Sequence, residues 1–394
     1  MSDIQLHDQK KSGECGGELM LYLHIPFCVR KCAYCDFLSG PATDDIIQAY
    51  VEALCLEIKV RSDEFTERII TSIYLGGGTP SLLSSKQVDS IMECIRKHFR
   101  IATGCEITME CNPGTAEFDT LSAYFSAGIN RLSIGLQSAD DNELASLGRI
   151  HRWDDFLSVY DNAYRAGFRN VNVDLISAIP GQTPVTWEKI LKKVLALEPS
   201  PKHFSVYSLI IEEGTPFYVK MNSGEFIGAM QIPSEDEDRE MYRLTGKLLQ
   251  EHGYEQYEIS NYAKPGYECR HNCGYWRRKD YLGLGIGSAS LIWESRYSNR
   301  TDLNGYIADP IGGRTSELLT VRDVMAEFMF LGLRMNEGVA KREFYEQFGK
   351  SMDEIYGDVI CKHVKDGLLI VDERNVRLTD KGMDLSNYVM ADFI

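Results

Sequence analysis

Six short runs of β-forming residues alternate with helical patterns along the first half of the chain. The runs begin at Leu19, Ile69, Cys105, Arg131, Asn170 and His203. Between the first two runs, apolar residues recur every three to four positions from residue 46 to residue 58, as an amphipathic helix requires. Repeated alternation of strand and helix predicts an α/β fold built from parallel βα units. The pattern fits an open doubly wound sheet or a partial barrel and does not choose between them.

The second half of the chain predicts different elements. An acidic stretch, PSEDEDRE, opens a helix that runs to about residue 253, with Ser234 as its N-cap. A region rich in Tyr, Trp and Gly follows to about residue 300, and from about residue 315 three helices and a hairpin resemble a winged-helix module. We therefore expect a polar tail (1–16), a core of βα units (17–235), an accessory region (236–314) and a mostly helical, winged-helix-like C-terminal domain (315–394).

Charge and hydropathy narrow the classes of function. The chain of 394 residues carries 42 Lys and Arg against 58 Asp and Glu, a formal net charge of −16. A chain this acidic repels a phosphate backbone, so we expect no nucleic-acid partner. Its opening lacks an apolar run of signal-peptide type, and no stretch of 18 apolar residues occurs. We therefore expect a cytoplasmic protein, at most peripheral to a membrane, in which cysteines are reduced.

Three of the 11 cysteines lie in one short loop directly after the first strand. The run CVRKCAYC spaces Cys28, Cys32 and Cys35 as C-x3-C-x2-C. Three thiolates this close can face one metal centre, either zinc or an iron–sulfur cluster. Zinc would need a fourth ligand, and the neighbouring sequence offers Asp36 but no His or Cys before His98 except Cys55 and Cys94, which belong to helical patterns. Three ligands suit a cluster with one open iron. A zinc site completed from elsewhere and unrelated buried thiols remain the alternatives.

The surrounding sequence resembles a known family. The run YLHIPFCVRKCAYCDF is similar to the signature of radical S-adenosylmethionine (SAM) proteins, and its flanks resemble the coproporphyrinogen-dehydrogenase-like branch. The resemblance implies a partial (βα)6 barrel in which Cys28, Cys32 and Cys35 hold a 4Fe–4S cluster and SAM chelates the fourth iron. It also implies one-electron cleavage of SAM to methionine and a 5′-deoxyadenosyl radical, with an electron donor such as flavodoxin or ferredoxin.

Other positions match the SAM site of that family. They are Tyr22, Tyr34, Gly77, Gly78, Thr79, Glu110, Gln137, Arg149 and Asp174. Taken singly, such residues are about as often turn glycines, helix caps, surface ion pairs or packed tyrosines. Their shared order relative to the cysteines favours a common site, because the carboxyl ends of parallel strands meet at one edge of a sheet.

Two features point to one branch of the family. Coproporphyrinogen dehydrogenases of this type carry a further cysteine two residues after the triplet, where this chain has Phe37. The run RHNCGYW matches the HNxxYW motif of HemW-type haem chaperones, through His271, Asn272, Tyr275 and Trp276. An imidazole beside two large aromatic rings can serve as an axial ligand with a porphyrin face. A thiolate from Cys269 or Cys273 and a hydrogen-bonded core histidine are the alternatives.

These features together predict a haem chaperone that binds haem and passes it to an acceptor, such as a membrane-associated respiratory protein. The rival hypothesis is a radical SAM enzyme acting on a tetrapyrrole, by oxidative decarboxylation of coproporphyrinogen III or ring-opening of haem. Phe37 weighs against the decarboxylation. A third hypothesis, RNA modification, conflicts with the net charge of −16 and with the lack of a basic C-terminal module.

Overall fold

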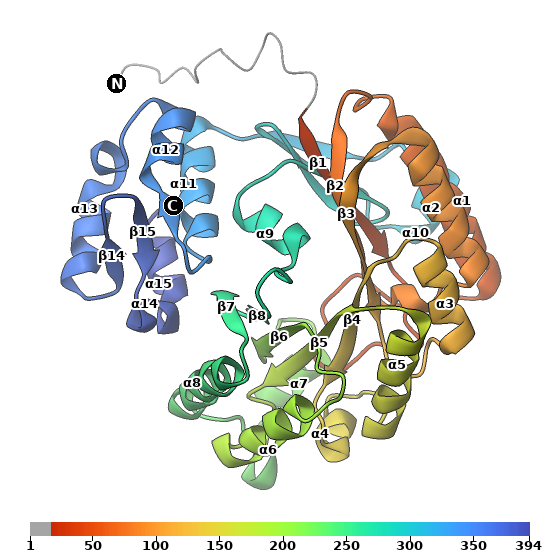
Figure 1. Ribbon diagram of the computed structural model, residues 1–394, viewed down its shortest axis with the longest axis horizontal. Coiled ribbons are helices and arrows are strands. Elements are labelled where there is room, and N and C mark those ends of the chain that lie inside the picture. Colours follow the sequence, from red (N-terminus) through yellow and green to blue (C-terminus); the bar gives the residue numbers. More distant parts are fainter. Residues whose placement is uncertain (1–16) are drawn as a thin grey trace.

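Six parallel strands lie at the positions of the six predicted β-rich runs (Figure 1). The computed structural model describes residues 17–394, so the predicted polar tail lies outside the described residues. The strands are β1 (Glu18–Ile25), β2 (Ile69–Gly77), β3 (Arg100–Cys111), β4 (Arg131–Gln137), β5 (Asn170–Ser177) and β6 (His203–Ser208). They pair in sequence order with parallel register.

The order of the strands distinguishes the two predicted architectures. A doubly wound sheet reverses its strand order at a switch point, whereas here β1 to β6 follow one another without reversal. Additional strands extend both edges of this 12-stranded sheet. β9 (Tyr281–Leu284), β10 (Ala289–Ile292), β11 (Ser295–Ser298) and β12 (Thr315–Leu318) continue from β1, and β8 (Asn261–Ala263) and β7 (Glu255–Glu258) continue from β6. The partial barrel is therefore confirmed.

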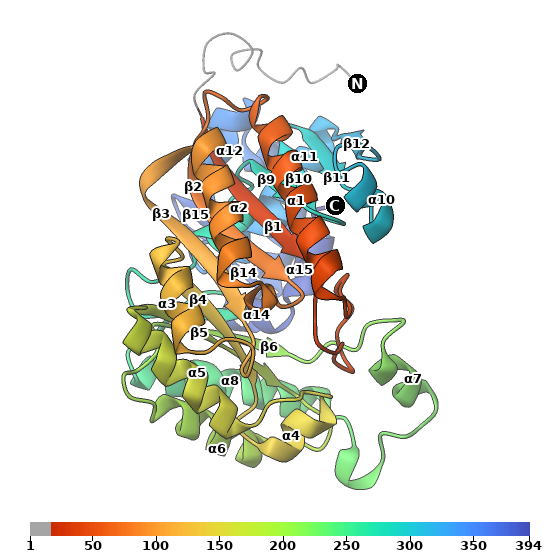
Figure 2. The same cartoon turned by 90° about the vertical axis from the view of Figure 1, so that its right-hand side faces the viewer.

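Helices cover the outer face of this curved sheet (Figure 2). They are α1 (Asp44–Ser62), α2 (Ser85–His98), α3 (Phe118–Ser126), α4 (Asp141–Ser146), α5 (Trp153–Ala166) and α6 (Pro184–Leu195). The predicted apolar face of α1 packs into the barrel core through Ile47, Leu54 and Ile58. α7 (Pro216–Asn222) projects from the body, and α8 (Glu235–Glu251) begins at the predicted N-cap Ser234 in a capping box with Glu237.

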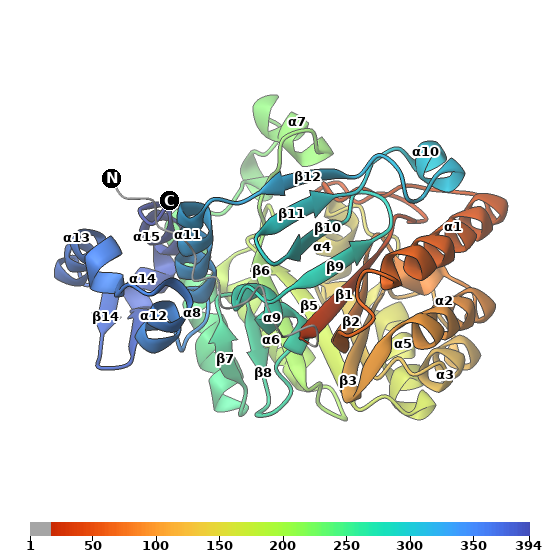
Figure 3. The same ribbon diagram turned by 90° about the horizontal axis from the view of Figure 1, so that it is seen from above.

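The C-terminal residues form a separate layer beside the barrel (Figure 3). Its elements are α11 (Val321–Gly332), β13 (Val339–Ala340), α12 (Lys341–Phe348), α13 (Met352–Lys365), β14 (Leu369–Val371), β15 (Asn375–Leu378), α14 (Asp380–Asp384) and α15 (Ser386–Ala391). The three antiparallel strands, in the order β13-β15-β14, and the helices before them give the expected winged-helix-like arrangement around a core of its own. Cys361 is exposed on α13.

Two further elements complete the accessory region. α9 (Arg270–Trp276) lies between the sheet and the C-terminal layer, where it contacts β2 and α11 (Figure 1). The glycine-rich segment from residue 281 to 287 is held by close backbone packing, because a Cβ on Gly283 would collide with the carbonyl of Ala289. α10 (Leu303–Ala308) then returns to α1, where Tyr306 donates to the buried Glu57 carboxylate at 2.7 Å. No helix within residues 17–394 is long and apolar enough to cross a membrane.

Candidate functional site

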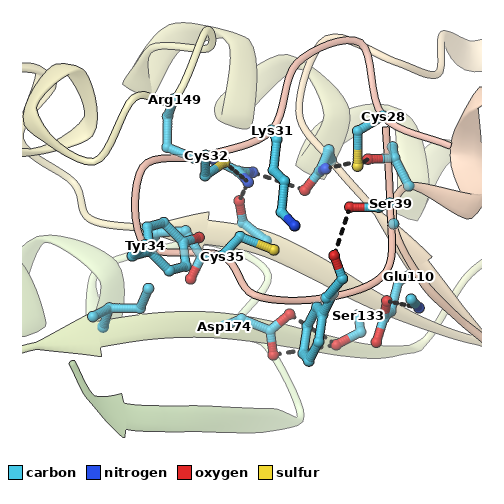
Figure 4. A pocket seen from close by; sticks show the side chains of 18 of the residues that line it. Cys28, Lys31, Cys32, Tyr34, Cys35, Ser39, Glu110, Ser133, Arg149 and Asp174 are labelled. Carbon is cyan, nitrogen blue, oxygen red and sulfur yellow. Dashed lines mark hydrogen bonds between the residues drawn. The ribbon is translucent and has the colours of Figure 1, made fainter. Parts of the chain in front are cut away.

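A cavity of ≈ 430 Å³ opens at the carboxyl ends of the barrel strands. Most residues predicted for the cluster and the SAM site line this one space: Cys28, Cys32, Tyr34, Cys35, Gly77, Gly78, Thr79, Glu110, Gln137, Arg149 and Asp174. Figure 4 shows the cysteine loop across the cavity from Glu110, Ser133 and Asp174. Residues from Cys28 to Asp174 thus converge, because parallel strands bring their ends to the same edge of the sheet.

The cysteine loop is tied to its neighbours through its backbone. Cys28 N donates to Gly40 O at 3.0 Å, which closes the loop on itself, and Ala33 N donates to Leu147 O at 3.0 Å. Gly148, with φ +78°, lets the segment after α4 approach the loop, since a Cβ there would lie 3.2 Å from Ala33 N. The three thiols are half-buried and free, and they face the cavity from a backbone fixed by neighbouring elements.

Polar side chains surround two of the three thiols. Arg149 Nη1 donates to Cys32 Sγ at 3.5 Å, and its Nη2 donates to Asn112 Oδ1 at 2.7 Å. Asn112 Nδ2 in turn donates to Thr79 Oγ1 at 2.7 Å, and Thr79 Oγ1 lies 3.4 Å from Cys28 Sγ. A cation and hydrogen-bond donors beside sulfur stabilise thiolates, so this network suits bound, negatively charged cysteine ligands.

The glycine run after β2 serves packing as well as ligand access. Gly78 N donates to Ile25 O at 2.8 Å and Thr79 N donates to Phe27 O at 2.7 Å, so the run is bound to the end of β1. A Cβ on Gly78 would lie 2.7 Å from Phe27 O, and Gly77 takes φ +110°, a conformation that favours glycine. The predicted turn role is therefore real, and it coexists with a backbone that lines the cavity.

Two carboxyl groups face the cavity from β3 and β5. Glu110 accepts from the Tyr74 hydroxyl at 2.9 Å and from Gly77 N at 3.0 Å, and burial raises the pKa of Glu110 to about 7. Asp174 accepts from Ser133 Oγ at 3.0 Å, and burial also raises its pKa. These groups are hydrogen-bond acceptors withdrawn from bulk water, which suits recognition of hydroxyl and amino groups of a ligand.

The remaining predicted SAM contacts differ in placement. Gln137 lines the cavity with φ 70°, a strained conformation for a residue with a side chain. Tyr34 also lines it, and burial raises the pKa of that phenol. Tyr22 lies outside the cavity lining; its hydroxyl is 3.0 Å from His24 Nδ1 and its ring stacks on Tyr74 at 6.3 Å. In this conformation Tyr22 can therefore influence the SAM site only through His24 and Tyr74.

Sequence reasoning missed Arg131, which is only 2 % exposed and lines the floor of the cavity. Within residues 17–394 its buried Nε has no hydrogen-bond partner. The period-two pattern of β4 could have found it, because Arg131, Ser133, Gly135 and Gln137 all point to the cavity.

The HNxxYW motif forms the short helix α9. His271 is 1 % exposed; its Nδ1 lies 2.9 Å from Ser72 Oγ and its Nε2 lies 3.0 Å from the Tyr275 hydroxyl. Burial lowers the pKa of His271 to about 3, so the imidazole is neutral. Asn272 reaches the barrel cavity, whereas Trp276 packs under the Arg334 guanidinium at 4.2 Å. The motif thus has Asn272 in the cavity lining and His271 buried behind it, with both ring nitrogens of His271 within hydrogen-bond distance of a partner.

The two cysteines beside His271 have different surroundings. Cys269 is fully buried and its thiol donates to Glu106 Oε1 at 3.6 Å. Glu106 also accepts from the backbone nitrogens of Arg270 and His271, each at 3.1 Å, so this carboxylate holds the start of α9. Cys273 lines a second cavity of ≈ 660 Å³ on the other side of the helix. Burial raises the pKa of both thiols.

The donor set fits an iron–sulfur cluster better than a single zinc ion. Among residues 17–394, no three side chains of His, Cys, Asp or Glu are placed to hold one metal ion. In a cluster each thiolate binds a different iron, so Cys28, Cys32 and Cys35 need only to line one space, as they do. The cavity volume also lies in the range of about 300–1,000 Å³ that is usual for cofactor sites.

Comparison with known proteins agrees with this geometry. Residues 22–194 match the family model of the radical SAM superfamily, and residues 319–385 match that of the HemN C-terminal domain. The fold and the cysteine loop thus define a radical SAM protein. The chain is 35% identical to the curated "Heme chaperone HemW" of Lactococcus lactis subsp. lactis (strain IL1403), over 95% of this chain and 96% of that protein. It is also 35% identical to that of Bacillus subtilis (strain 168), over 95% and 98%. The chain belongs to the HemW family, as predicted.

A solved structure supports the same assignment. Coproporphyrinogen III oxidase (HemN) from Escherichia coli, described as a radical SAM enzyme, superposes with a TM-score of 0.82 at 26% sequence identity. The match covers 98% of this chain and 92% of that chain, so it includes the barrel and the C-terminal domain. The predicted fold class is confirmed, and membership of the radical SAM superfamily implies SAM and a 4Fe–4S cluster as cofactors.

Proposed function

We propose that this protein is a haem chaperone, which binds haem and passes it to an acceptor protein. The observation that carries the proposal is its 35% identity, over nearly the whole chain, to curated haem chaperones. Phe37 supports it, because the related decarboxylases carry a cysteine there. The rival function is radical SAM chemistry on a tetrapyrrole, favoured by the likeness to coproporphyrinogen III oxidase.

In this proposal Cys28, Cys32 and Cys35 hold a 4Fe–4S cluster, which supplies one-electron reduction of SAM when it is bound. The SAM-contacting set is Tyr34, Gly77, Gly78, Thr79, Glu110, Gln137, Arg149 and Asp174, and Tyr22 supports it through its stacking on Tyr74. Arg149 offsets thiolate charge through its bond to Cys32 Sγ. The carboxyl groups of Glu110 and Asp174 accept hydrogen bonds from ligand donors, and the walls of the barrel exclude water.

Haem binding is assigned to the HNxxYW motif, with His271 as iron ligand and Asn272, Tyr275 and Trp276 completing the site. Ligation needs a free lone pair on the imidazole, whereas both ring nitrogens of His271 are engaged here. We therefore propose that haem binding releases His271 from Ser72 or Tyr275 and opens α9. The cost of breaking one such bond is about 1 kcal/mol, which iron ligation readily exceeds.

Partners and organisation follow from the same proposal. The acceptor would be a protein such as a membrane-associated respiratory enzyme, and a donor such as flavodoxin or ferredoxin would reduce the cluster. We divide the chain into a barrel (17–235), an accessory region with the haem motif (236–314) and a winged-helix-like domain (315–394). β12 still pairs with the barrel sheet, and most of the second apolar cluster lies after it, which supports a C-terminal domain that begins near residue 319.

Haem titration of the reconstituted protein tests this function. We expect a Soret band that saturates at one haem per chain, and a weaker or shifted band in His271→Ala. A spectrum and affinity that are identical in both proteins would remove His271 as a ligand. Anaerobic incubation with dithionite, SAM and coproporphyrinogen III tests the rival function, because product in excess of the protein would show an enzyme.

A further inference from the structure

Strand β2 connects the proposed SAM site to the proposed haem motif through its inward-facing side chains. Ser72 and Tyr74 lie two residues apart and therefore face the same side of the sheet. Ser72 Oγ lies 2.9 Å from His271 Nδ1, and the ring of Tyr74 stacks on the His271 imidazole with centroids 5.1 Å apart and planes at 29°. The strand thus supports the imidazole at its edge and on its face.

The other end of the Tyr74 side chain belongs to the SAM site. Its hydroxyl donates to Glu110 Oε1 at 2.9 Å, while Glu110 Oε2 accepts from Gly77 N at 3.0 Å. A Cβ on Gly76 would lie 2.8 Å from Tyr74 Cε1, so glycine at that position leaves room for the ring. One side chain therefore contacts both the carboxylate that faces the cavity and the histidine of the motif.

We propose that Tyr74 is a positioning residue that couples the two sites, so that SAM in the barrel keeps His271 closed and weakens haem binding. This inference rests on the proposed function. SAM carries a sulfonium and an ammonium group, and positive charge near Glu110 favours its ionised form. An ionised carboxylate accepts the Tyr74 hydroxyl more strongly than a neutral carboxyl does. The phenol ring is then held against His271, which must move for haem to bind.

The coupling acts in both directions. If one ligand changes the affinity for a second ligand by some factor, then the second ligand changes the affinity for the first by the same factor. Haem binding should therefore weaken SAM binding as much as SAM weakens haem binding. Typical couplings between sites are about 5-fold to 150-fold, and one charge-assisted hydrogen bond places this one near the lower end, at about 5-fold to 10-fold.

The test is haem titration of the reconstituted chain with its cluster oxidised, with no reductant, with and without saturating SAM. We expect SAM to raise the haem Kd of the wild type about 5-fold to 10-fold. In Tyr74→Phe the ring remains but the hydroxyl is absent, so the SAM effect should fall below about twofold. Tyr254→Phe is the matched control, because it also loses a buried phenol bond, to Pro201 O at 2.7 Å, and should keep the full effect.

The outcomes separate this inference from the function on which it rests. If the wild type binds no haem, the proposed function fails. If it binds haem and SAM, but SAM leaves the haem Kd unchanged or tightens it, the chaperone function stands and the coupling is overturned. A SAM effect of wild-type size in Tyr74→Phe would overturn the role of Tyr74. Circular dichroism of each variant verifies that the comparison is made between folded proteins.

Discussion

Replacing Glu110 by Gln tests the electrostatics of the cavity. Burial raises the pKa of this carboxyl from 4.5 to about 7. A group with a higher pKa in the folded chain binds its proton more tightly there, so its ionisation opposes folding as the pH rises from about 4.5 to about 7. At about 1.4 kcal/mol per pKa unit, the shift of about 2.5 costs up to about 3 kcal/mol at pH 8. We expect about 2 kcal/mol, because the side chain is partly open to the cavity.

We expect the difference in the free energy of unfolding between Glu110→Gln and the wild type to change with pH. Urea unfolding of the cluster-free protein, followed by circular dichroism, gives the free energy of unfolding of both proteins at pH 5 and pH 8. Relative to the wild type, Glu110→Gln should gain about 2 kcal/mol between these two pH values. Loss of the bond from Gly77 N lowers stability at every pH and cancels in this comparison. Glu188→Gln, on the exposed surface of α6, is the control. A variant-to-wild-type difference that is the same at both pH values would refute the reasoning.

Two further substitutions test the packing and the charge around the cysteine loop. Gly78→Ala places a Cβ 2.7 Å from Phe27 O and should lower the free energy of unfolding in urea by about 1–3 kcal/mol. Gly357→Ala is the control: its Cβ meets nothing within 4 Å in helix α13, so it should raise that free energy by about 0.5–1 kcal/mol. Equal effects of the two substitutions would contradict close packing at Gly78. Arg149→Gln removes the cation that donates to Cys32 Sγ, so the cluster should have a more negative midpoint potential in a potentiometric titration, and an unchanged potential would contradict the assigned contact.

The barrel and its site could be predicted because their signals are regular or local. Each strand and helix shows its own short periodic pattern, and the three cysteines share one loop. Both features can therefore be recognised from neighbouring residues alone. Positions such as Glu110 and Asp174 were predicted from the family resemblance, and the parallel sheet brings their strands to one edge. The choice between a barrel and an open sheet required either the family resemblance or the observed strand order.

Other features depend on contacts that no local pattern carries. Arg131 follows the period-two pattern of β4, but that pattern alone does not show that this face of the strand lines a cavity. The engagement of both His271 nitrogens comes from Ser72, 199 positions earlier, and from Tyr275. The motif predicts which residues gather in α9, but not that its imidazole is sealed in this conformation.

In the proposed function, one chain carries both a SAM-binding cluster and a haem that it can transfer. The most direct measurement is the anaerobic ultraviolet–visible spectrum of the reconstituted, haem-loaded chain, with cluster iron and haem counted in the same sample. We expect cluster iron that is lost in Cys28→Ala, together with one haem per chain that leaves when an apo-acceptor is added. A chain that assembles the cluster but retains no haem, and that turns over coproporphyrinogen III with SAM, would contradict it.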